Sequence, residues 1–314
     1  MTQGTRRLLD WLPTAVLCAA LAGPSAARSQ GAAPALPATP QAAVDELLAA
    51  DRAFSAASAK TDLVSGLAAM FDADVIMPLP NGKFAEGAVK VTEALRGTPD
   101  NVRSRIEWAP IRGGISADAQ QGFTFGYMTL HRPDGTTLPL RYMSYWIRRP
   151  EGWRVAVYKR ARGTEDEPKL APMPPSLPER LVPATSDAAT IERLRLSLAQ
   201  AEGAFSDEAQ RIGLGPAFVR YGSADAVNMG GPSGYAVGSE AIGRRVAEGE
   251  PAGGSSVSWG ADKAIVASSG DLGVTIGVIR PNAPPANGAQ PAGFPFFTIW
   301  RRAGPTAPWR YIAE

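Results

Sequence analysis

The sequence ADRAFS at residues 50–55 returns as AEGAFS at residues 201–206, and this pair decides the fold. The second stretch starts 151 positions after the first, and Trp108 and Trp259 are separated by the same interval. Self-similarity at one fixed offset is typical of a repeated structural unit. We therefore expect two similar domains in tandem.

The composition is that of a folded protein without a marked electrostatic preference. Of the 314 residues, 45% are hydrophobic and 20% are charged, which is close to the globular average and predicts a packed core. The net charge is +2, and basic and acidic residues are interspersed along the chain. Nucleic-acid binding needs basic residues concentrated on one face, so we expect no nucleic-acid partner.

The chain has a single cysteine, Cys18, and a single histidine, His131. A zinc site built from these residue types needs three or four of them, so we expect no metal and no cofactor. His131 is followed by Arg-Pro-Asp-Gly, which is typical of a hairpin turn between two strands. We therefore interpret it as a turn residue and not as a catalytic base.

The N-terminus has the pattern of a secretory signal peptide over residues 1–27. Arg6 and Arg7 precede an almost wholly apolar run over residues 15–23, and the small residues Ser25-Ala26-Ala27 follow it. We predict cleavage after Ala27, a periplasmic or secreted mature protein and no membrane association after cleavage, with an uncleaved anchor as the alternative. Residues 28–40 form a proline-containing flexible lead-in.

The first repeat, residues 41–160, changes from helical to strand periodicity along its length. Helices are expected over residues 41–58, 64–71 and 89–95, and strands over residues 75–77, 103–111, 122–130, 138–147 and 153–158. This order predicts an α+β fold and not alternating βαβ units. The second repeat, residues 190–314, follows the same order after a proline-rich linker over residues 161–189. The acidic run at residues 165–167 is interpreted as a solvated part of that linker.

Several motifs resemble a known group of proteins. They are DAQQGFTFG at 118–126, YWIR at 145–148 and GWRV at 152–155 in the first repeat, and SGDLGVTIG at 269–277 and WRR at 300–302 in the second. This pattern resembles the SnoaL-like proteins and the related domain of unknown function 4440, both in the nuclear transport factor 2-like superfamily. The resemblance implies two tandem cone-shaped domains, each a curved antiparallel sheet wrapped around N-terminal helices and enclosing an apolar pocket.

The resemblance implies a fold more firmly than an activity. Some relatives are isomerases, dehydratases or cyclases, whereas others bind ligands or pair with partners. The pocket histidines of the dehydratases, and the tyrosine and two aspartates of the ketosteroid isomerases, have no residue-by-residue match in this chain. No catalytic residue is therefore transferred, and we favour binding over catalysis.

An acidic residue lies on the apolar face of the first helix in each repeat. Asp51 follows Leu47 at helical spacing and precedes Phe54, and Glu202 lies in the same way before Phe205. A carboxylate on a core face must be paired, hydrogen-bonded or neutral. Three interpretations are open: a structural tie to a backbone amide or an arginine such as Arg141, a pocket acid with a raised pKa that binds a ligand or transfers protons, or an exposed group at the helix edge.

Alternation along the strands supplies the remaining candidates. Phe123, Phe125 and Tyr127 share one strand face, which we assign to the core and the pocket. The opposite face, with Thr124 and Gly126, carries small residues that would let the sheet of the other repeat approach. We therefore expect the repeats to pair as an internal pseudo-dimer.

The sequence predicts an exported tandem-domain protein that binds a small, mainly apolar ligand in its cone pockets. The alternatives are an isomerase, dehydratase or cyclase that uses a pocket carboxylate, and a protein-interaction module. The ligand-binding candidates are Asp51, Phe54, Trp108, Tyr127, Tyr145, Glu202, Phe205 and Trp259.

Overall fold

The computed structural model describes residues 37–230, 234–283 and 293–314. The expected signal peptide and nearly all of the lead-in lie outside the described residues. Leu36–Glu314 form one compact unit. Within the described part of the chain, no helix combines the length and the hydropathy needed to cross a bilayer.

The first half contains three α-helices and six strands, with short 3-10 turns at Pro80–Gly82 and Pro99–Asn101. The helices are α1 (Pro40–Ser58), α2 (Leu63–Ala68) and α3 (Ala88–Arg96), and the strands are β1 (Phe71–Leu79), β2 (Lys83–Glu86), β3 (Arg105–Ile115), β4 (Gln121–His131), β5 (Thr137–Arg149) and β6 (Gly152–Arg162). The second expected helix ends three residues early, and Phe71 instead begins β1, which is longer than the strand predicted at 75–77.

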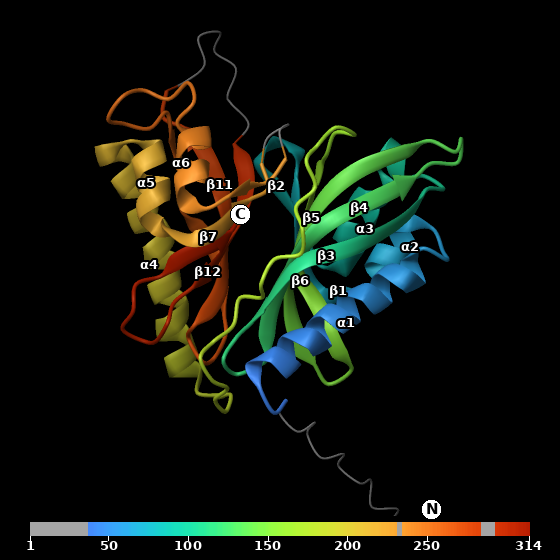
Figure 1. The fold of residues 1–314 in the computed structure, drawn as a ribbon, viewed down its shortest axis with the longest axis horizontal. Helices are drawn as coiled ribbons and strands as arrows, with labels where there is room; N and C mark the ends of the chain where they lie inside the picture. The colour runs from blue at the N-terminus through green and yellow to red at the C-terminus, as the bar shows by residue number, and fades with distance from the viewer. Residues whose placement is uncertain (1–36, 231–233, 284–292) are drawn as a thin grey trace, which may run out of the picture. The chain divides into compact units, whose positions relative to one another are not determined.

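The second half repeats this order. The helices are α4 (Ala188–Ile212), α5 (Leu214–Tyr221) and α6 (Ser239–Val246), and the strands are β7 (Gly222–Asn228), β8 (Ala236–Val237), β9 (Val257–Ser258), β10 (Ala261–Val266), β11 (Leu272–Pro281), β12 (Phe294–Arg301) and β13 (Arg310–Ala313). Figure 1 shows α1 running along one face of the first sheet and α4 along one face of the second.

The long helix of each half begins at a side-chain cap and buries one stripe. The hydroxyl of Thr39 accepts a hydrogen bond from the backbone of Ala42 at the start of α1, and Asp187 caps α4 in the same way. In α1 the buried stripe continues from Val44 and Leu47 to Asp51. The apolar spacing therefore fixes which way the acid faces, which is toward the sheet.

The two sheets have the same strand order. It is β2-β1-β6-β5-β4-β3 in the first half and β8-β7-β13-β12-β11-β10 in the second, with β9 paired to β11. The α+β fold predicted from the sequence is confirmed. The prediction of wholly antiparallel sheets is wrong for one pair in each half, because β1 runs parallel to β6 and β7 runs parallel to β13.

The two faces of each central strand are the reverse of those expected. Phe123 and Phe125 lie in a core cluster that also contains Val274 and Ile276 of the second sheet, so the large side chains fill the space between the sheets. Thr124 instead lies on the side of the helix, where it accepts a hydrogen bond from Trp146. The small residues leave room for the helix and its acid, and not for the other sheet.

The segment between the halves is packed along the edge strand β3. Ser176 donates its backbone N–H to Gly113, and Ile115 donates to Ser176 in return. The interpretation of residues 165–167 as solvated is wrong for Glu167, which is buried and forms an ion pair with buried Arg141 at 3.1 Å. The pairing of two buried charges explains how Glu167 alone can lie in the interior while Glu165 and Asp166 remain exposed.

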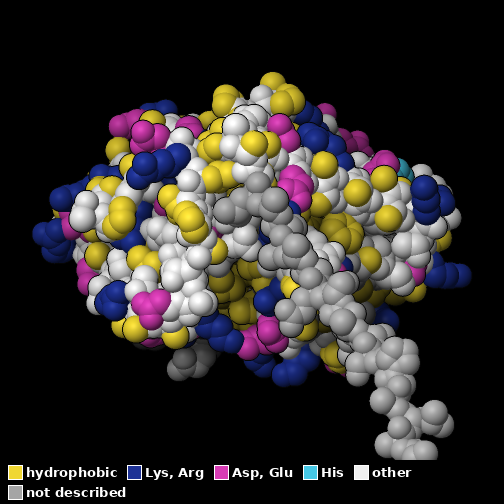
Figure 2. All heavy atoms as spheres, turned by 90° about the horizontal axis from the view of Figure 1, so that it is seen from below, with side chains coloured by type: hydrophobic (Ala, Val, Ile, Leu, Met, Phe, Trp, Pro, Cys, Tyr) yellow, Lys and Arg dark blue, Asp and Glu magenta, His cyan; other side chains and the backbone are white. Residues whose placement is uncertain are grey.

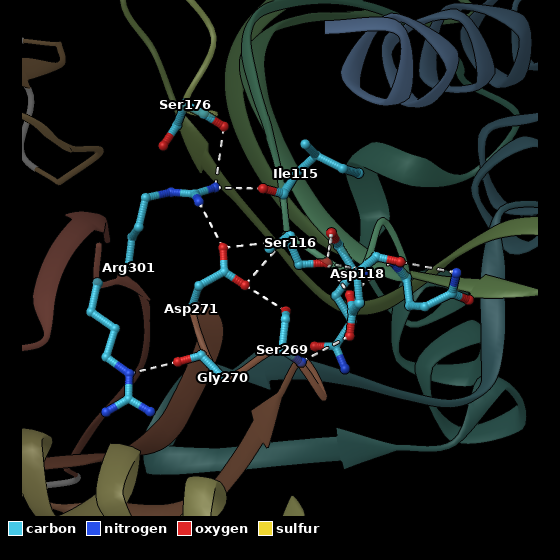
Figure 3. A network of polar contacts seen from close by, with 12 residues as sticks. Ile115, Ser116, Asp118, Ser176, Ser269, Gly270, Asp271 and Arg301 are labelled. Carbon is cyan, nitrogen blue, oxygen red and sulfur yellow. Dashed lines mark hydrogen bonds and ion pairs between the residues drawn. The ribbon is translucent and has the colours of Figure 1, made fainter. Parts of the chain in front are cut away.

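The hairpin tips of the two halves hold each other through reciprocal hydrogen bonds (Figure 3). Asp118 of the first half accepts from the hydroxyl of Ser268 and from the backbone of Ser269. Asp271 of the second half accepts from the backbone of Ala117 and forms an ion pair with Arg301 at 3.0 Å. Each tip therefore binds backbone groups of the other, and we call this arrangement the Asp118–Asp271 clasp.

The charge pattern of the surface follows that of the sequence. Figure 2 shows basic and acidic side chains interspersed with hydrophobic ones on the face that it displays. The structure thus adds no concentrated basic face there that would suit a nucleic acid.

Candidate functional site

Asp51 is fully buried between α1 and the first sheet. Its carboxylate accepts hydrogen bonds from the indole N–H of Trp108 at 2.5 Å and from the hydroxyl of Tyr142 at 2.7 Å. Burial raises the pKa of Asp51, and the bonds from Tyr142 and Trp108 partly oppose that rise. The acid therefore ties the helix to the sheet, and its partners are an indole and a phenol in place of the backbone amide or arginine considered from the sequence.

Glu202 occupies the equivalent position between α4 and the second sheet and is also fully buried. One carboxylate oxygen accepts from the indole N–H of Trp259 at 2.7 Å. The other accepts from the indole N–H of Trp300 at 3.0 Å and from the hydroxyl of Thr275. Burial raises the pKa of Glu202 to about 7, against the opposing effect of these donors.

In both halves, the serine four positions after the acid contacts the same tryptophan as the acid does. Ser55 exchanges two hydrogen bonds of 2.7 Å with the backbone of Trp108, and Ser206 accepts from the backbone of Trp259 at 2.9 Å. The acid and the serine thus bind the same tryptophan from one helix face. This explains why the two hexapeptides preserve the acid and the serine four positions apart.

The phenylalanine of each hexapeptide belongs to an aromatic cluster. Phe54 is half-buried and stacks on Trp146 with ring centroids 6.0 Å apart. Phe205 is buried and contacts the rings of Phe218 at 4.8 Å and Trp259 at 4.9 Å. The denser second cluster forms one wall of a cavity.

A cavity of about 290 Å³ lies beside Glu202 in the second half. Its lining is mainly apolar and includes Phe205, Leu214, Phe218, Val246, Trp259, Ile279 and Phe296. The lining also includes the polar side chains of Lys159, Glu202, Asn228, Thr298 and Glu314. Apolar walls with a few polar groups are typical of small-molecule sites.

Lys159 reaches this cavity from the other half of the chain. It lies on β6 of the first sheet, and its ammonium group donates to the backbone carbonyl of Phe297 at 3.3 Å and lies 4.5 Å from that ring. Burial lowers the pKa of Lys159 to about 8, and the charge of Glu314 opposes this shift. The cavity is therefore built from both halves.

Glu314 and Asn228 lie at the same end of the cavity as the lysine. Asn228 donates its amide to Glu314 at 2.5 Å, and the backbone of Glu314 is hydrogen-bonded to Val227 on β7 and to Met229, which follows that strand. Burial raises the pKa of Glu314, while Asn228 and Lys159 oppose that rise. Sequence reasoning missed all three polar residues, because no local motif marks side chains that only the packing of the two sheets brings together.

One residue explains why the acids of the two halves have different surroundings. Tyr142 pairs with Gly126 across β4 and β5, and Phe296 pairs with the equivalent Gly277 across β11 and β12. The phenol of Tyr142 fills the space beside Asp51 and bonds to it. Phe296 has no hydroxyl to reach Glu202, and its ring lines the cavity instead.

Two sequence candidates lie away from the cavity. Tyr145 is buried in the core between the sheets and donates to the side chain of Gln121 at 2.6 Å. Tyr127 accepts from the backbone of Leu170 at 2.9 Å and lies under the ammonium group of Lys169 at 4.3 Å. Both tyrosines hold the junction of the halves and the linker, and the strand-face reversal accounts for the error.

The described residues contain no cluster of three or more His, Cys, Asp or Glu side chains arranged to hold a metal ion. His131 lies at the end of β4, and its ring nitrogen Nε2 lies 3.0 Å from a carboxylate oxygen of Glu107. It is not among the residues that line the cavity.

Comparisons with known proteins find structural similarity only. No protein-family model matches the chain, and no curated protein matches it significantly. An NTF2-like protein with a cystatin-like fold from Novosphingobium aromaticivorans is similar at 13% identity, with 38% of this chain and 80% of that chain covered and a TM-score of 0.30.

Two further solved structures give the same result. A domain of unknown function with a cystatin-like fold from Nostoc punctiforme shares 18% identity over 36% of this chain and 75% of its own, with a TM-score of 0.31. A ketosteroid isomerase-like protein from Erwinia carotovora atroseptica shares 17% identity over 38% of this chain and 97% of its own, with a TM-score of 0.29.

Proposed function

We propose that the protein binds a small, mainly apolar molecule with one polar end in the cavity of the second half. The observation that carries the proposal is the cavity of about 290 Å³, with aromatic walls and with Lys159, Glu202 and Glu314 on its lining. Burial of apolar ligand surface supplies the affinity. The few polar groups on the lining fix the orientation of the ligand's polar end, as in most small-molecule sites.

Because Lys159 of the first half lines the cavity of the second, pairing of the two halves is part of the proposed function. The Asp118–Asp271 clasp and the core shared by the sheets support an internal pseudo-dimer. Under this proposal the second half provides the chamber and the first half provides the amine at its polar end. The protein acts on molecules outside the cytoplasm, as the signal-peptide pattern of residues 1–27 indicates; N-terminal sequencing of the mature protein tests this, and a retained Met1 would contradict it.

Binding of a small probe tests the proposal. 2-Naphthol has a flat apolar body and one hydroxyl, and we expect saturable binding to the full chain by fluorescence titration. The Val246→Phe variant places a larger side chain on the cavity wall and should weaken binding at least about tenfold. Val89→Phe is the matched control, because Val89 is 72% exposed on α3. Absence of saturable binding, or unchanged binding by Val246→Phe, would sink the proposal.

A second candidate function is acid–base catalysis by Glu202. It is favoured by one observation, the pKa of about 7 for a carboxyl group on a cavity wall, since such a group can both accept and donate a proton near neutral pH. Three donors already occupy its oxygens, which favours the binding proposal. Under the catalytic candidate Glu202→Gln abolishes turnover, whereas under the binding proposal it changes affinity only.

A further inference from the structure

We infer that Lys159 is a nucleophilic amine that forms a reversible imine with an aldehyde or ketone bound in the second-half cavity. The inference rests on the proposed function and names the chemistry of the ligand's polar end. It is carried by the position of the amine on the lining of an apolar cavity, against Phe297 and near two carboxyl groups.

The position of the amine is fixed by its neighbours. The ring and the carbonyl oxygen of Phe297 both contact the end of the lysine side chain, at 4.5 Å and 3.3 Å. When the amine is neutral, one N–H satisfies that carbonyl, and the nitrogen lone pair is free to meet a ligand. A lysine desolvated in an apolar pocket is the usual form of a nucleophilic lysine, and burial lowers the pKa of Lys159 accordingly to about 8.

The charges around the amine favour a neutral carbonyl ligand over a carboxylate. Glu202 and Glu314 already place two carboxyl groups on the lining, against the single ammonium group of Lys159. A ligand carboxylate would bring a third acidic group into the same apolar space, where unpaired charge is costly. An aldehyde or ketone brings none.

The reaction balances with the groups that are present. The nitrogen attacks the carbonyl carbon and forms a C–N bond as the C=O π bond breaks; the nitrogen then loses one proton and the oxygen gains one, which gives a neutral carbinolamine. Loss of that oxygen as water, with one proton taken from nitrogen, gives the C=N bond. Glu314, whose pKa is raised by burial and whose charge interacts with Lys159, is positioned to give and retake the proton.

Reductive trapping tests the inference with a matched pair of probes. The full chain is incubated with 2-naphthaldehyde and sodium cyanoborohydride, and the product is analysed by intact mass and peptide mapping. We expect one naphthylmethyl group on Lys159, formed at least about tenfold faster than on exposed lysines such as Lys60. Lys159→Arg should lose this adduct, whereas Lys60→Arg should keep it.

Two further measurements do not depend on the folding of a variant. Excess 2-naphthol should suppress the adduct on Lys159 of the unmodified protein and leave exposed lysines unaffected. The equilibrium fraction of imine on Lys159, read from its absorbance before any reductant is added, should increase as the pH rises through about 8, because the neutral amine is the nucleophile.

The outcomes separate this inference from the proposed function. Saturable 2-naphthol binding without preferential labelling of Lys159 overturns the inference and leaves the proposed function standing. Labelling of Lys159 that 2-naphthol does not suppress also overturns it, because the reaction then takes place outside the binding site. Failure of 2-naphthol to bind overturns both.

Discussion

The two halves place an acid at the same point of the same scaffold and surround it differently. Asp51 lies in a filled core, where the phenol of Tyr142 occupies the space beside it. Glu202 has one more methylene group and reaches Trp300 as well as Trp259, and the equivalent Phe296 leaves it beside a cavity. The comparison teaches that one hydroxyl group and one methylene group can separate an acid in a filled core from an acid beside a cavity on a shared fold.

Removing the carboxylate of Asp51 or of Glu202 should reveal the largest difference in stability between the halves. Asp51→Ala leaves the indole of Trp108 and the hydroxyl of Tyr142 without an acceptor in a dry core, and we expect a loss of roughly 4 kcal/mol in the free energy of unfolding. Glu202→Ala should cost roughly 2 kcal/mol, because water in the adjoining cavity can satisfy the donors that it leaves. Urea denaturation of both variants measures the difference, and equal losses would contradict the contrast between filled and hollow halves.

The raised pKa of Glu202 should make the free energy of unfolding depend on pH in a way that can be assigned to this residue. Its pKa is about 7 in the folded protein against an ordinary value of 4.5, so the folded state holds a proton that the unfolded state releases. The stability that this group contributes is therefore fully present below about pH 4.5 and is lost as the pH rises through about 7. The loss amounts to roughly 3 kcal/mol.

Glu202→Gln should remove this component, because the amide does not titrate. The difference between the unfolding free energies of the two proteins is measured from pH 4.5 to pH 8, so that titration of Asp51 and Glu314 cancels. A difference that stays constant over this range would mean that Glu202 keeps an ordinary pKa and is not desolvated.

Exchanging the residues at the equivalent positions 142 and 296, which are tyrosine in the first half and phenylalanine in the second, should have the smallest effect on stability. Tyr142→Phe removes one of the two donors to Asp51 and should cost about 1.5 kcal/mol. Phe296→Tyr adds a hydroxyl to the wall of the second cavity and should alter stability by less than about 1 kcal/mol while weakening 2-naphthol binding. If Phe296→Tyr binds the probe as the unmodified protein does, residue 296 does not decide which half has the chamber.

Local patterns predicted most of the helices and strands because the signals are strong. The apolar stripe of α1 and the alternation in β4 and β5 required no knowledge of the other half. The parallel pairing of β1 with β6 was missed, because a resemblance to curved sheets says nothing about the direction of each neighbour. The α+β class was nevertheless correct.

The sequence predicted only part of the candidate site, because some of its residues lie far apart along the chain and are brought together only by the fold. Asp51 and Glu202 lie on the buried faces of their helices, as the helix spacing predicted, but their hydrogen bonds from Trp108 and Trp259 were not predicted. Lys159 could not be found, since alternation along β6 does not show what lies opposite it. The strand faces were reversed because small residues fit a helix as well as a second sheet.

The Asp118–Asp271 clasp joins two surfaces that are alike but not identical. In a homodimer with twofold symmetry, every substitution occurs in both subunits at once, so a chamber cannot be opened on one side and filled on the other. A single polypeptide is free of that constraint. Covalent linkage of the halves therefore permits division of labour: the first half keeps a filled core beside its acid and contributes a single amine to the cavity of the second.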